Sequence, residues 1–171
     1  KSLLLNRLVA RHGLARVSKT PGRTQQVNFF SIGGNWLLVD LPGYGFARAP
    51  RAVQAMWQRL VEAYLTSRRT VCGVVVLVDL RRGIEADDTL LLGFLRRQGI
   101  PALLVATKID KLRRSARRLQ LHKMGSTEPG VPIIGCSALT GEGIPELRAA
   151  LLHLLTDTAR DGRRSERETS A

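Results

Sequence analysis

Apolar residues recur along this chain in two periods, one typical of helices and one typical of strands. Residues 2–12 and 51–68 carry apolar side chains at helical spacing, so each segment is predicted to be an amphipathic helix. Between them, residues 26–32 and 36–40 have a strand-like composition, and Gly33–Gly34 supplies a turn signal. We therefore expect an antiparallel hairpin between the first two helices.

Three further segments are nearly continuous apolar runs, which are typical of parallel strands covered on both faces. They span residues 72–79, 101–107 and 131–137. Helical patterns follow each run, at residues 86–98, 111–125 and 144–156. Alternating strands and helices predict an α/β fold with a mostly parallel sheet and one antiparallel hairpin strand.

The segments between and after these elements are predicted to be irregular. Residues 13–25 and 41–50 are rich in Gly and Pro, which is typical of loops. Residues 157–171 lack large apolar side chains, so we expect a disordered polar tail. We find no internal repeat and no sign of a second domain, and we expect a single domain over residues 1–156.

Positive charge is the unusual property of the composition. The 171 residues include 27 Lys and Arg against 14 Asp and Glu, a formal net charge of +13. The charges of the polar tail cancel, so the predicted domain carries the whole excess. This favours a polyanionic partner, and RNA over a membrane, because no basic amphipathic helix stands apart from the core. The alternative for any single basic pair is a solvated helix face.

Other features of the sequence argue against secretion and membrane insertion. No apolar run approaches the roughly 18 residues that span a bilayer, and we find no leader segment. Cys72 and Cys136 lie in apolar runs and are expected to be core residues in a reducing cytosol. His12, His122 and His153 are too scattered to favour a metal site. We expect a cytoplasmic monomer without stable membrane contact.

In parallel α/β sheets, ligands bind at the carboxyl ends of strands, so the loops after residues 40, 79, 107 and 137 are the candidates. Asp110 follows Lys108 just past the second apolar run, at 101–107. A carboxylate can accept hydrogen bonds from the ring N–H and the exocyclic amino group of guanine, a pair that adenine lacks. The stem of Lys108 can lie across the purine, and Thr107 can brace the loop. A surface lysine and a helix-capping aspartate are the alternative.

Two other strand ends suit a nucleotide as well. Asp40 begins "DLPGYG", where an acid can hold Mg²⁺ through water and Gly43 lets a backbone N–H approach a terminal phosphate. In "CSALTGEG", the small Ser137 and Ala138 would let backbone N–H groups reach the guanine carbonyl. A Pro-Gly turn and a helix N-cap are the respective alternatives.

The first two residues complete the pattern. Lys1 and Ser2 open a predicted helix, as do the last two residues of the phosphate-loop motif G-x-x-x-x-G-K-[ST]. There the lysine reaches the β- and γ-phosphates and the serine hydroxyl binds Mg²⁺. The four pieces occur in one order, each after a strand or before a helix, which favours a guanine-nucleotide site over four unrelated turns.

These motifs together resemble the EngB family (also called YihA or YsxC), small bacterial GTPases of the translation-factor class implicated in ribosome assembly and normal cell division. The resemblance extends to about residue 156. The segments that carry it are "KTPGRTQQVNFF" at 19–30, "LVDLPGYGFA" at 38–47, "VVVLVDLRRG" at 75–83, "ATKIDKL" at 106–112 and "CSALTGEGI" at 136–144. It implies a Ras-like P-loop NTPase fold with three α/β/α layers.

The resemblance implies bound GTP or GDP with Mg²⁺. Thr24 would be the mobile threonine that closes on the metal, although Thr20 is a rival on chemistry alone. The implied catalytic residues are Lys1, Thr24 and Gly43. The implied metal ligands are Ser2, Thr24 and, through water, Asp40. The implied nucleotide-binding residues are Lys1, Ser2, Gly22, Arg23, Thr24, Gln25, Gln26, Asp40, Leu41, Pro42, Gly43, Thr107, Lys108, Ile109, Asp110, Cys136, Ser137 and Ala138.

Two departures from the family pattern change the expectation. The strand and glycines that precede the phosphate-loop lysine are missing before Lys1, so we expect a fragment that binds GTP poorly until they are restored. That strand would lie between those at 36–40 and 72–79. Tyr44 stands where Ras-like enzymes keep a water-positioning glutamine, so intrinsic hydrolysis is expected to be slow.

Three functional hypotheses follow. The first is a GTP-hydrolysing switch that docks on the assembling large ribosomal subunit, through rRNA and its basic surface, and is required for normal division. The second is an RNA- or ribosome-binding scaffold with little or no GTP turnover. The third is a division factor acting at the septum, for which the sequence carries no membrane- or filament-binding feature.

Overall fold

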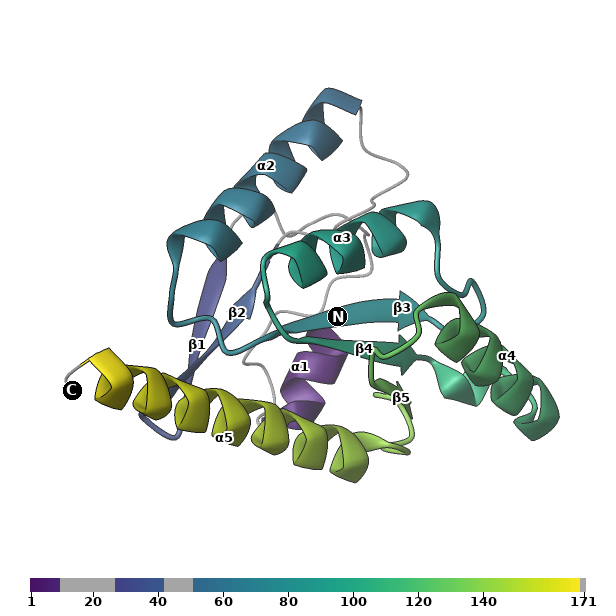
Figure 1. Ribbon diagram of the computed structural model, residues 1–171. Helices are drawn as coiled ribbons and strands as arrows, with labels where there is room; N and C mark the ends of the chain where they lie inside the picture. The colour runs from purple at the N-terminus through teal and green to yellow at the C-terminus, as the bar shows by residue number, and fades with distance from the viewer. Residues whose placement is uncertain (10–26, 42–50, 170–171) are drawn as a thin grey trace. The chain divides into compact units, whose positions relative to one another are not determined.

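The computed structural model describes residues 1–9, 27–41 and 51–169 (Figure 1). Within the helices, the side chains of Arg51, Gln54, Trp57 and residues 157–169 lie outside this description. The chain divides into two units, Lys1–Arg69 and Thr70–Ala171. We describe each unit by itself, and the single domain expected over residues 1–156 stays a prediction.

The first unit consists of two helices and a hairpin. Its elements are α1 (Ser2–Leu8), β1 (Asn28–Ile32), β2 (Trp36–Asp40) and α2 (Arg51–Ser67). The two strands pair antiparallel, and Phe30 lies opposite Leu38. Gly33 and Gly34 have φ angles of 61° and 78°, which a glycine adopts without strain at this tight turn. The predicted hairpin and the predicted second helix are confirmed.

The apolar positions of both helices are buried only in part, since Leu3 of α1 and Met56 and Leu60 of α2 are exposed. Val61 and Leu65 of α2 are each 4% exposed, and Leu4 of α1 is equally buried. The ring of Phe29 on β1 lies 6.2 Å from that of Tyr64 on α2, so an aromatic contact joins the hairpin to the helix. The end of the predicted helix at 2–12 and the loop at 13–25 fall mostly outside the described residues.

The second unit contains a parallel three-stranded sheet. Its strands are β3 (Val74–Asp79), β4 (Ala102–Thr107) and β5 (Ile133–Cys136), in the order β3-β4-β5. Four residues of the central strand, 103–106, are at most 4% exposed, which explains its unbroken apolar sequence. Asp79 lies opposite Thr107, and Thr107 opposite Cys136, so the carboxyl ends of all three strands meet at one edge.

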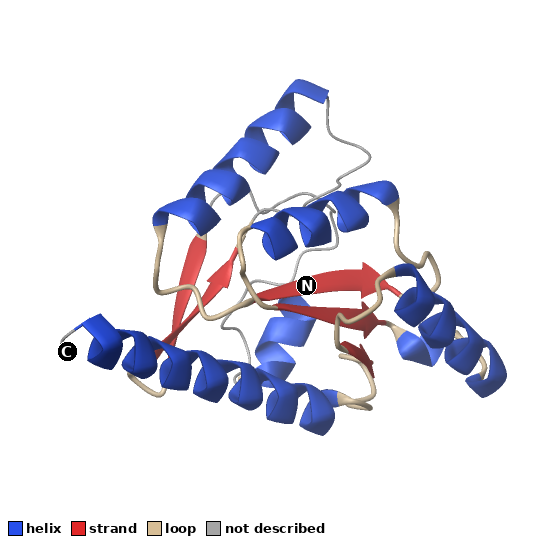
Figure 2. Ribbon diagram, in the orientation of Figure 1, coloured by secondary structure: helices blue, strands red, loops and turns tan. Residues whose placement is uncertain are grey.

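Helices cover this sheet. They are α3 (Ala86–Arg97), the 3₁₀ turn η1 (Ile109–Lys111), α4 (Arg114–Thr127) and α5 (Ile144–Thr169). Figure 1 shows α3 above the sheet and α5 below it, and Figure 2 shows helices alternating with strands along this unit. Together with the antiparallel hairpin, this arrangement confirms the predicted α/β fold. Among the described residues, no helix is long and apolar enough to cross a membrane.

Two helix boundaries differ from those expected. The helix expected from 111 begins at Arg114, because η1 and the extended backbone of Arg113 precede it. The last helix, expected to end near 156 before a disordered tail, continues to Thr169. Its last residues, "ARDGRRSERET", are dominated by good helix formers and contain no proline, so helix propensity extends the element beyond its apolar stripe.

Candidate functional site

The turn after β4 carries the first group of candidate residues. Lys108 has a φ angle of 61°, which is left-handed and uncommon for a residue with a side chain. This conformation turns the chain sharply out of the sheet and into η1. The hydroxyl of Thr107 donates to the carbonyl of Val78 at 3.0 Å and fastens the turn to the neighbouring strand. Thr107 therefore braces the loop, as the sequence predicts.

Asp110 lies in η1 and faces the loop after β5. Its side chain is 12% exposed. The hydroxyl of Ser137 donates to its Oδ1 at 2.6 Å, and the ammonium of Lys111 lies 3.2 Å from its Oδ2. The Ser137 hydroxyl, followed by Lys111, holds the pKa of the Asp110 carboxyl below its ordinary value. Residues 27 positions apart in sequence are thus brought together as predicted.

The loop that presents Ser137 is closed by its own hydrogen bonds. The backbone N–H of Ser137 donates to the carbonyl of Glu142 at 2.8 Å, and that of Gly141 donates to the carbonyl of Ser137 at 2.9 Å. Thr140 N–H donates to the Ser137 hydroxyl oxygen at 3.2 Å. Ser137 is fully buried. A hydroxyl held on both sides in this way is a fixed donor toward Asp110.

The side chains of two residues in the predicted nucleotide site, Ile109 and Cys136, are part of the core, as expected for Cys136. Ile109 is 6% exposed and Cys136 is fully buried. Burial raises the pKa of the Cys136 thiol to about 11, so the thiol stays protonated at neutral pH. Only the backbone of these two residues is left to contact a ligand. Their side chains pack the loops against the sheet, which the motif alone does not reveal.

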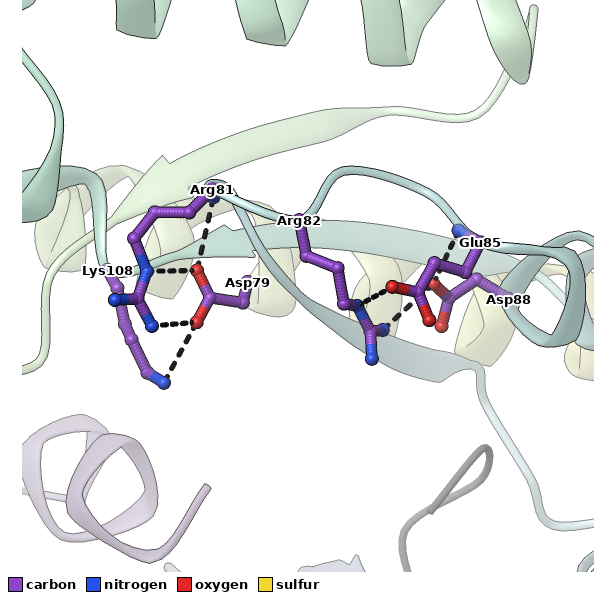
Figure 3. Close-up of polar contacts among 6 residues, drawn as sticks. All are labelled: Asp79, Arg81, Arg82, Glu85, Asp88 and Lys108. Atoms are coloured by element: carbon purple, nitrogen blue, oxygen red, sulfur yellow. Dashed lines mark hydrogen bonds and ion pairs between the residues drawn. The ribbon is translucent and has the colours of Figure 1, made fainter. Parts of the chain in front are cut away.

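Asp79, at the end of β3, is a site residue that sequence reasoning missed. Figure 3 shows Arg81 and Lys108 converging on its carboxylate. Arg81 donates from Nε to Oδ1 at 3.0 Å and from Nη2 to Oδ2 at 2.6 Å, and Lys108 Nζ donates to Oδ2 at 2.9 Å. The Arg81 guanidinium, more than Lys108, holds the pKa of the Asp79 carboxyl well below its ordinary value.

The missed residue carried a signal in the sequence. Asp79 ends a buried strand in "VVVLVDLRRG", and the loop after it was one of the four candidate loops. Ion pairs between Arg82 of this loop and two acids, Glu85 and Asp88, are also drawn in Figure 3 and join the loop to the start of α3. Arg82 lies 3.0 Å from Glu85 and 3.1 Å from Asp88. The loop between β3 and α3 is therefore a rigid support.

The other group of candidate residues lies in the first unit. Asp40 ends β2 and is 6% exposed. The ammonium of Lys1 lies 2.8 Å from Asp40 Oδ1 and donates to the carbonyl of Leu41 at 2.6 Å. The lysine expected on phosphates and the acid expected near a metal are therefore neighbours. Ser2 follows Lys1 in sequence and begins α1.

The remaining predicted residues lie outside the described ranges. They are Gly22, Arg23, Thr24, Gln25, Gln26, Pro42 and Gly43, together with Thr20 and Tyr44. Among the described residues, no three His, Cys, Asp or Glu side chains form a group that could hold a metal ion by themselves. The donors present, a carboxylate at Asp40 and a hydroxyl at Ser2, are oxygen ligands of the kind Mg²⁺ uses with water and phosphate. The residue types therefore fit Mg²⁺.

Comparisons with known proteins agree on one family. Residues 1–108 match the family model described as "50S ribosome-binding GTPase". The probable GTP-binding protein EngB of Syntrophomonas wolfei is 43% identical over 157 residues, covering 91% of this chain and 81% of that protein. The EngB protein of Halothermothrix orenii is also 43% identical, over 159 residues that cover 91% of this chain and 80% of that protein.

Solved structures share the fold. A crystal structure of a probable GTP-binding protein engB has a TM-score of 0.74 at 24% identity and covers 92% of this chain and 93% of its own. Era in complex with MgGDPNP and nucleotides 1506–1542 of 16S ribosomal RNA has a TM-score of 0.69 at 20% identity, over 90% of this chain and 52% of its own. At these identities the likeness concerns the fold.

Proposed function

The chain belongs to the EngB family of GTP-binding proteins and is a GTPase, and from this premise we propose that it is a GTP-operated switch in assembly of the large ribosomal subunit. In this proposal, GTP orders the loops around Thr24 and Asp40, and its hydrolysis releases them. The observation that carries the proposal is the fixed position of the Asp110 carboxylate, which Ser137 and Lys111 hold. It lies past the end of β4, where we propose that guanine is recognised.

Asp110 retains the capacity to bind a base. A carboxylate offers about four lone-pair sites, and Ser137 and Lys111 use one on each oxygen. The ring N–H and the exocyclic amino group of guanine would take the remaining two. Adenine presents an acceptor at the ring position and has no amino group beside it at C2, so it would offer the carboxylate no hydrogen bond and would repel it. The fixed hydroxyl of Ser137 keeps the carboxylate in one orientation.

Lys108 and the loop after β5 would complete base recognition. With its ammonium bound to Asp79 at 2.9 Å, the Lys108 stem has a fixed direction and can cover the face of the purine. Thr107 braces the turn, and the backbone N–H groups of Cys136 and Ala138 are the candidates for the guanine carbonyl. Ile109 would contribute backbone alone.

The phosphates and Mg²⁺ are assigned to the first unit. We assign Lys1 to the β- and γ-phosphates, and Ser2, Thr24 and, through water, Asp40 to the metal. Mg²⁺ supplies charge neutralisation on the phosphates when it is bound. Gly43 would donate its backbone N–H to the γ-phosphate, and the segment 22–26 would close over it. The Lys1 ammonium, which lies 2.8 Å from Asp40 Oδ1, would contact phosphate oxygens from this position.

The proposed partner is ribosomal RNA of the large subunit, met in the cytoplasm. The net charge of +13 favours a polyanion. The matching family model carries the description "50S ribosome-binding GTPase", and Era, which has this fold, binds a ribosomal RNA segment. A shortage of large subunits would then explain a division defect without a septal partner.

Multiple-turnover phosphate release by the full-length protein tests the proposal. We expect slow release from GTP alone, faster release with purified 50S subunits, and no comparable response to 30S subunits. Depletion in cells should cause precursors of the large subunit to accumulate. Stable binding to 50S subunits with no GTP turnover under any condition would favour the scaffold hypothesis instead.

A further inference from the structure

Helix α4 turns one face toward the sheet and the other toward solvent. On the inner face, Met124 is 1% exposed, Leu121 is half-buried, and the helix contacts β5. Side chains three and four positions apart share one face of a helix. By that spacing the outer face is continuous, and its exposed residues are Arg114, Ser115, Arg118, Leu119, His122 and Lys123.

This outer face carries positive charge that the helix itself does not neutralise. The sequence of α4 contains no acidic residue. Among the described residues, Arg114, Arg118 and Lys123 take part in no ion pair. Arg117 differs, because it donates to both carboxylate oxygens of Glu142 at 2.9 Å. Arg117 therefore fixes α4 to the loop after β5.

Several basic residues elsewhere in the second unit are matched by acids. Arg81 pairs with Asp79, Arg82 with Glu85 and Asp88, Arg96 with Glu128, and Lys111 with Asp110. Among the described residues, Arg97 and Arg113 also take part in no ion pair. Helix α4 differs because it carries three such cations on one face that has no acidic residue. Positions four apart in sequence are about 6 Å apart along a helix axis. The cations of α4 therefore form a row that suits a row of phosphates.

The same face carries a shallow depression that is open to solvent. Its border is formed by Ser115, Arg118, Leu119 and His122, and Leu119 is 72% exposed. Covering such a leucine is favourable, and guanidinium and imidazole planes are surfaces on which unstacked RNA bases lie. A duplex keeps its bases stacked inside, so a depression of this composition favours a single-stranded segment.

We propose that the outer face of α4 docks a single-stranded segment of RNA. Arg114, Arg118 and Lys123 contact its phosphates, and the depression around Leu119 receives one unstacked base. The inference rests on the proposed ribosomal RNA partner and names the surface and the strandedness of the RNA that it binds.

The test compares two triple charge reversals in the full-length protein. The first is Arg114→Glu, Arg118→Glu and Lys123→Glu. The matched control is Arg59→Glu, Arg69→Glu and Arg97→Glu, which changes the net charge equally at exposed positions that are not part of α4. Fluorescence anisotropy measures binding of a labelled single-stranded RNA of about 12 nucleotides and of its duplex. GDP affinity and melting temperature verify that each variant is folded.

We expect wild type to prefer the single strand over the duplex. The α4 variant should lose at least about tenfold in affinity, and its slope of log K against log salt should fall by about 2, since each lost phosphate contact contributes about 0.7. Leu119→Ser should weaken single-strand binding and leave the salt slope unchanged. Equal losses in the two triple variants, or a preference for duplex, would overturn the assignment to α4.

Failure of this inference can be told from failure of the proposed function. If wild type binds RNA and 50S subunits and the α4 variant binds both equally well, the docking surface alone is wrong. If wild type binds neither at low salt, the ribosomal partner itself is wrong. Binding to 50S subunits that depends on α4, without binding to naked RNA, would indicate a ribosomal protein and overturn the RNA assignment.

Discussion

At the scale of single residues, the base-recognition turn is held by partners from two neighbouring strands. Ser137 fixes Asp110 from the loop after β5, and Asp79 fixes Lys108 from the end of β3. Both contacts are made by charged groups, which are stronger than neutral hydrogen bonds. The two residues that would meet guanine are therefore preorganised, and changes to their partners should alter nucleotide binding as well as stability.

Asp110→Asn is the most informative substitution in this turn. The amide replaces one acceptor oxygen with a donor, so it faces the guanine amino group donor to donor. We expect GDP affinity to fall by at least about a hundredfold. Xanthosine diphosphate, which carries a carbonyl in place of the amino group, should gain affinity relative to GDP. Titration of both nucleotides checks this, and unchanged GDP affinity would show that Asp110 does not contact the base.

Asp79 predicts a pH dependence of stability. Its pKa lies below the ordinary value of 3.8, so the carboxylate contributes fully to the free energy of unfolding above that pH and loses the contribution as pH falls. We expect Asp79→Asn to lower that free energy by about 1–2 kcal/mol at pH 7. Urea denaturation should show the difference narrowing between about pH 4 and pH 2. A difference independent of pH would assign the loss to packing. GDP should also dissociate faster from this variant.

At the scale of elements, the loop between β5 and α5 depends on a glycine. Gly143 has a φ angle of 75°, and a Cβ there would overlap the carbonyl oxygen of Gly135 and lie 3.0 Å from the Cα of Cys136. Side chains at such positions meet both backbone strain and a steric clash. The loop that presents Ser137 can therefore close only with glycine at its end.

Gly143→Ala separates these two effects when it is compared with Gly130→Ala. Gly130 has a φ angle of 82° with open space around its Cβ position, so it bears the strain without the clash. We expect a loss of about 1 kcal/mol at Gly130 and about 2 kcal/mol more at Gly143, measured by urea denaturation. GDP affinity should fall in the Gly143 variant alone. An equal fall in the free energy of unfolding for both variants would mean that the loop shifts to accept the new Cβ at Gly143 at no additional cost.

Much of this pattern of helices and strands can be predicted from sequence, because the residues of each element favour the structure that the element adopts. The hairpin has a glycine pair at its turn, and β4 is an unbroken apolar run flanked by covered faces. The start of α4 and the end of α5 could not be predicted from the sequence. A 3₁₀ turn delays α4, and the polar end of α5 is helical without an apolar stripe. Apolar periodicity reports burial, and neither boundary is set by burial.

The candidate site followed from sequence in the same uneven way. Motif spacing pointed to Asp110, Ser137 and Asp40, because each stands at or within three residues of the carboxyl end of a strand. It could not identify Asp79, whose role depends on the register that places it opposite Thr107. It also assigned Ile109 and Cys136 to the ligand without showing that, with their side chains buried, only their backbone groups could reach it. Register and burial are properties of the folded sheet, which a motif does not specify.

At the scale of the whole molecule, guanine selectivity and basic charge have separate roles. Asp110 and its partners select the nucleotide, while the unmatched cations of α4 belong to a different surface of the second unit. Substitutions at Asp110 and its partners should change nucleotide affinity and leave RNA affinity intact, and substitutions on α4 should do the reverse. A nucleotide-binding defect with intact RNA binding, or the reverse, is therefore the pattern expected of single variants.

Nucleotide selectivity tests the central claim most directly. The dissociation constants of fluorescent GDP and ADP should be measured for the full-length protein with Mg²⁺. Because adenine would offer Asp110 no donor and would set a ring acceptor against its carboxylate, we expect GDP to bind at least about a thousandfold more tightly. Comparable affinity for the two nucleotides would contradict recognition of guanine by Asp110 and the function built on it.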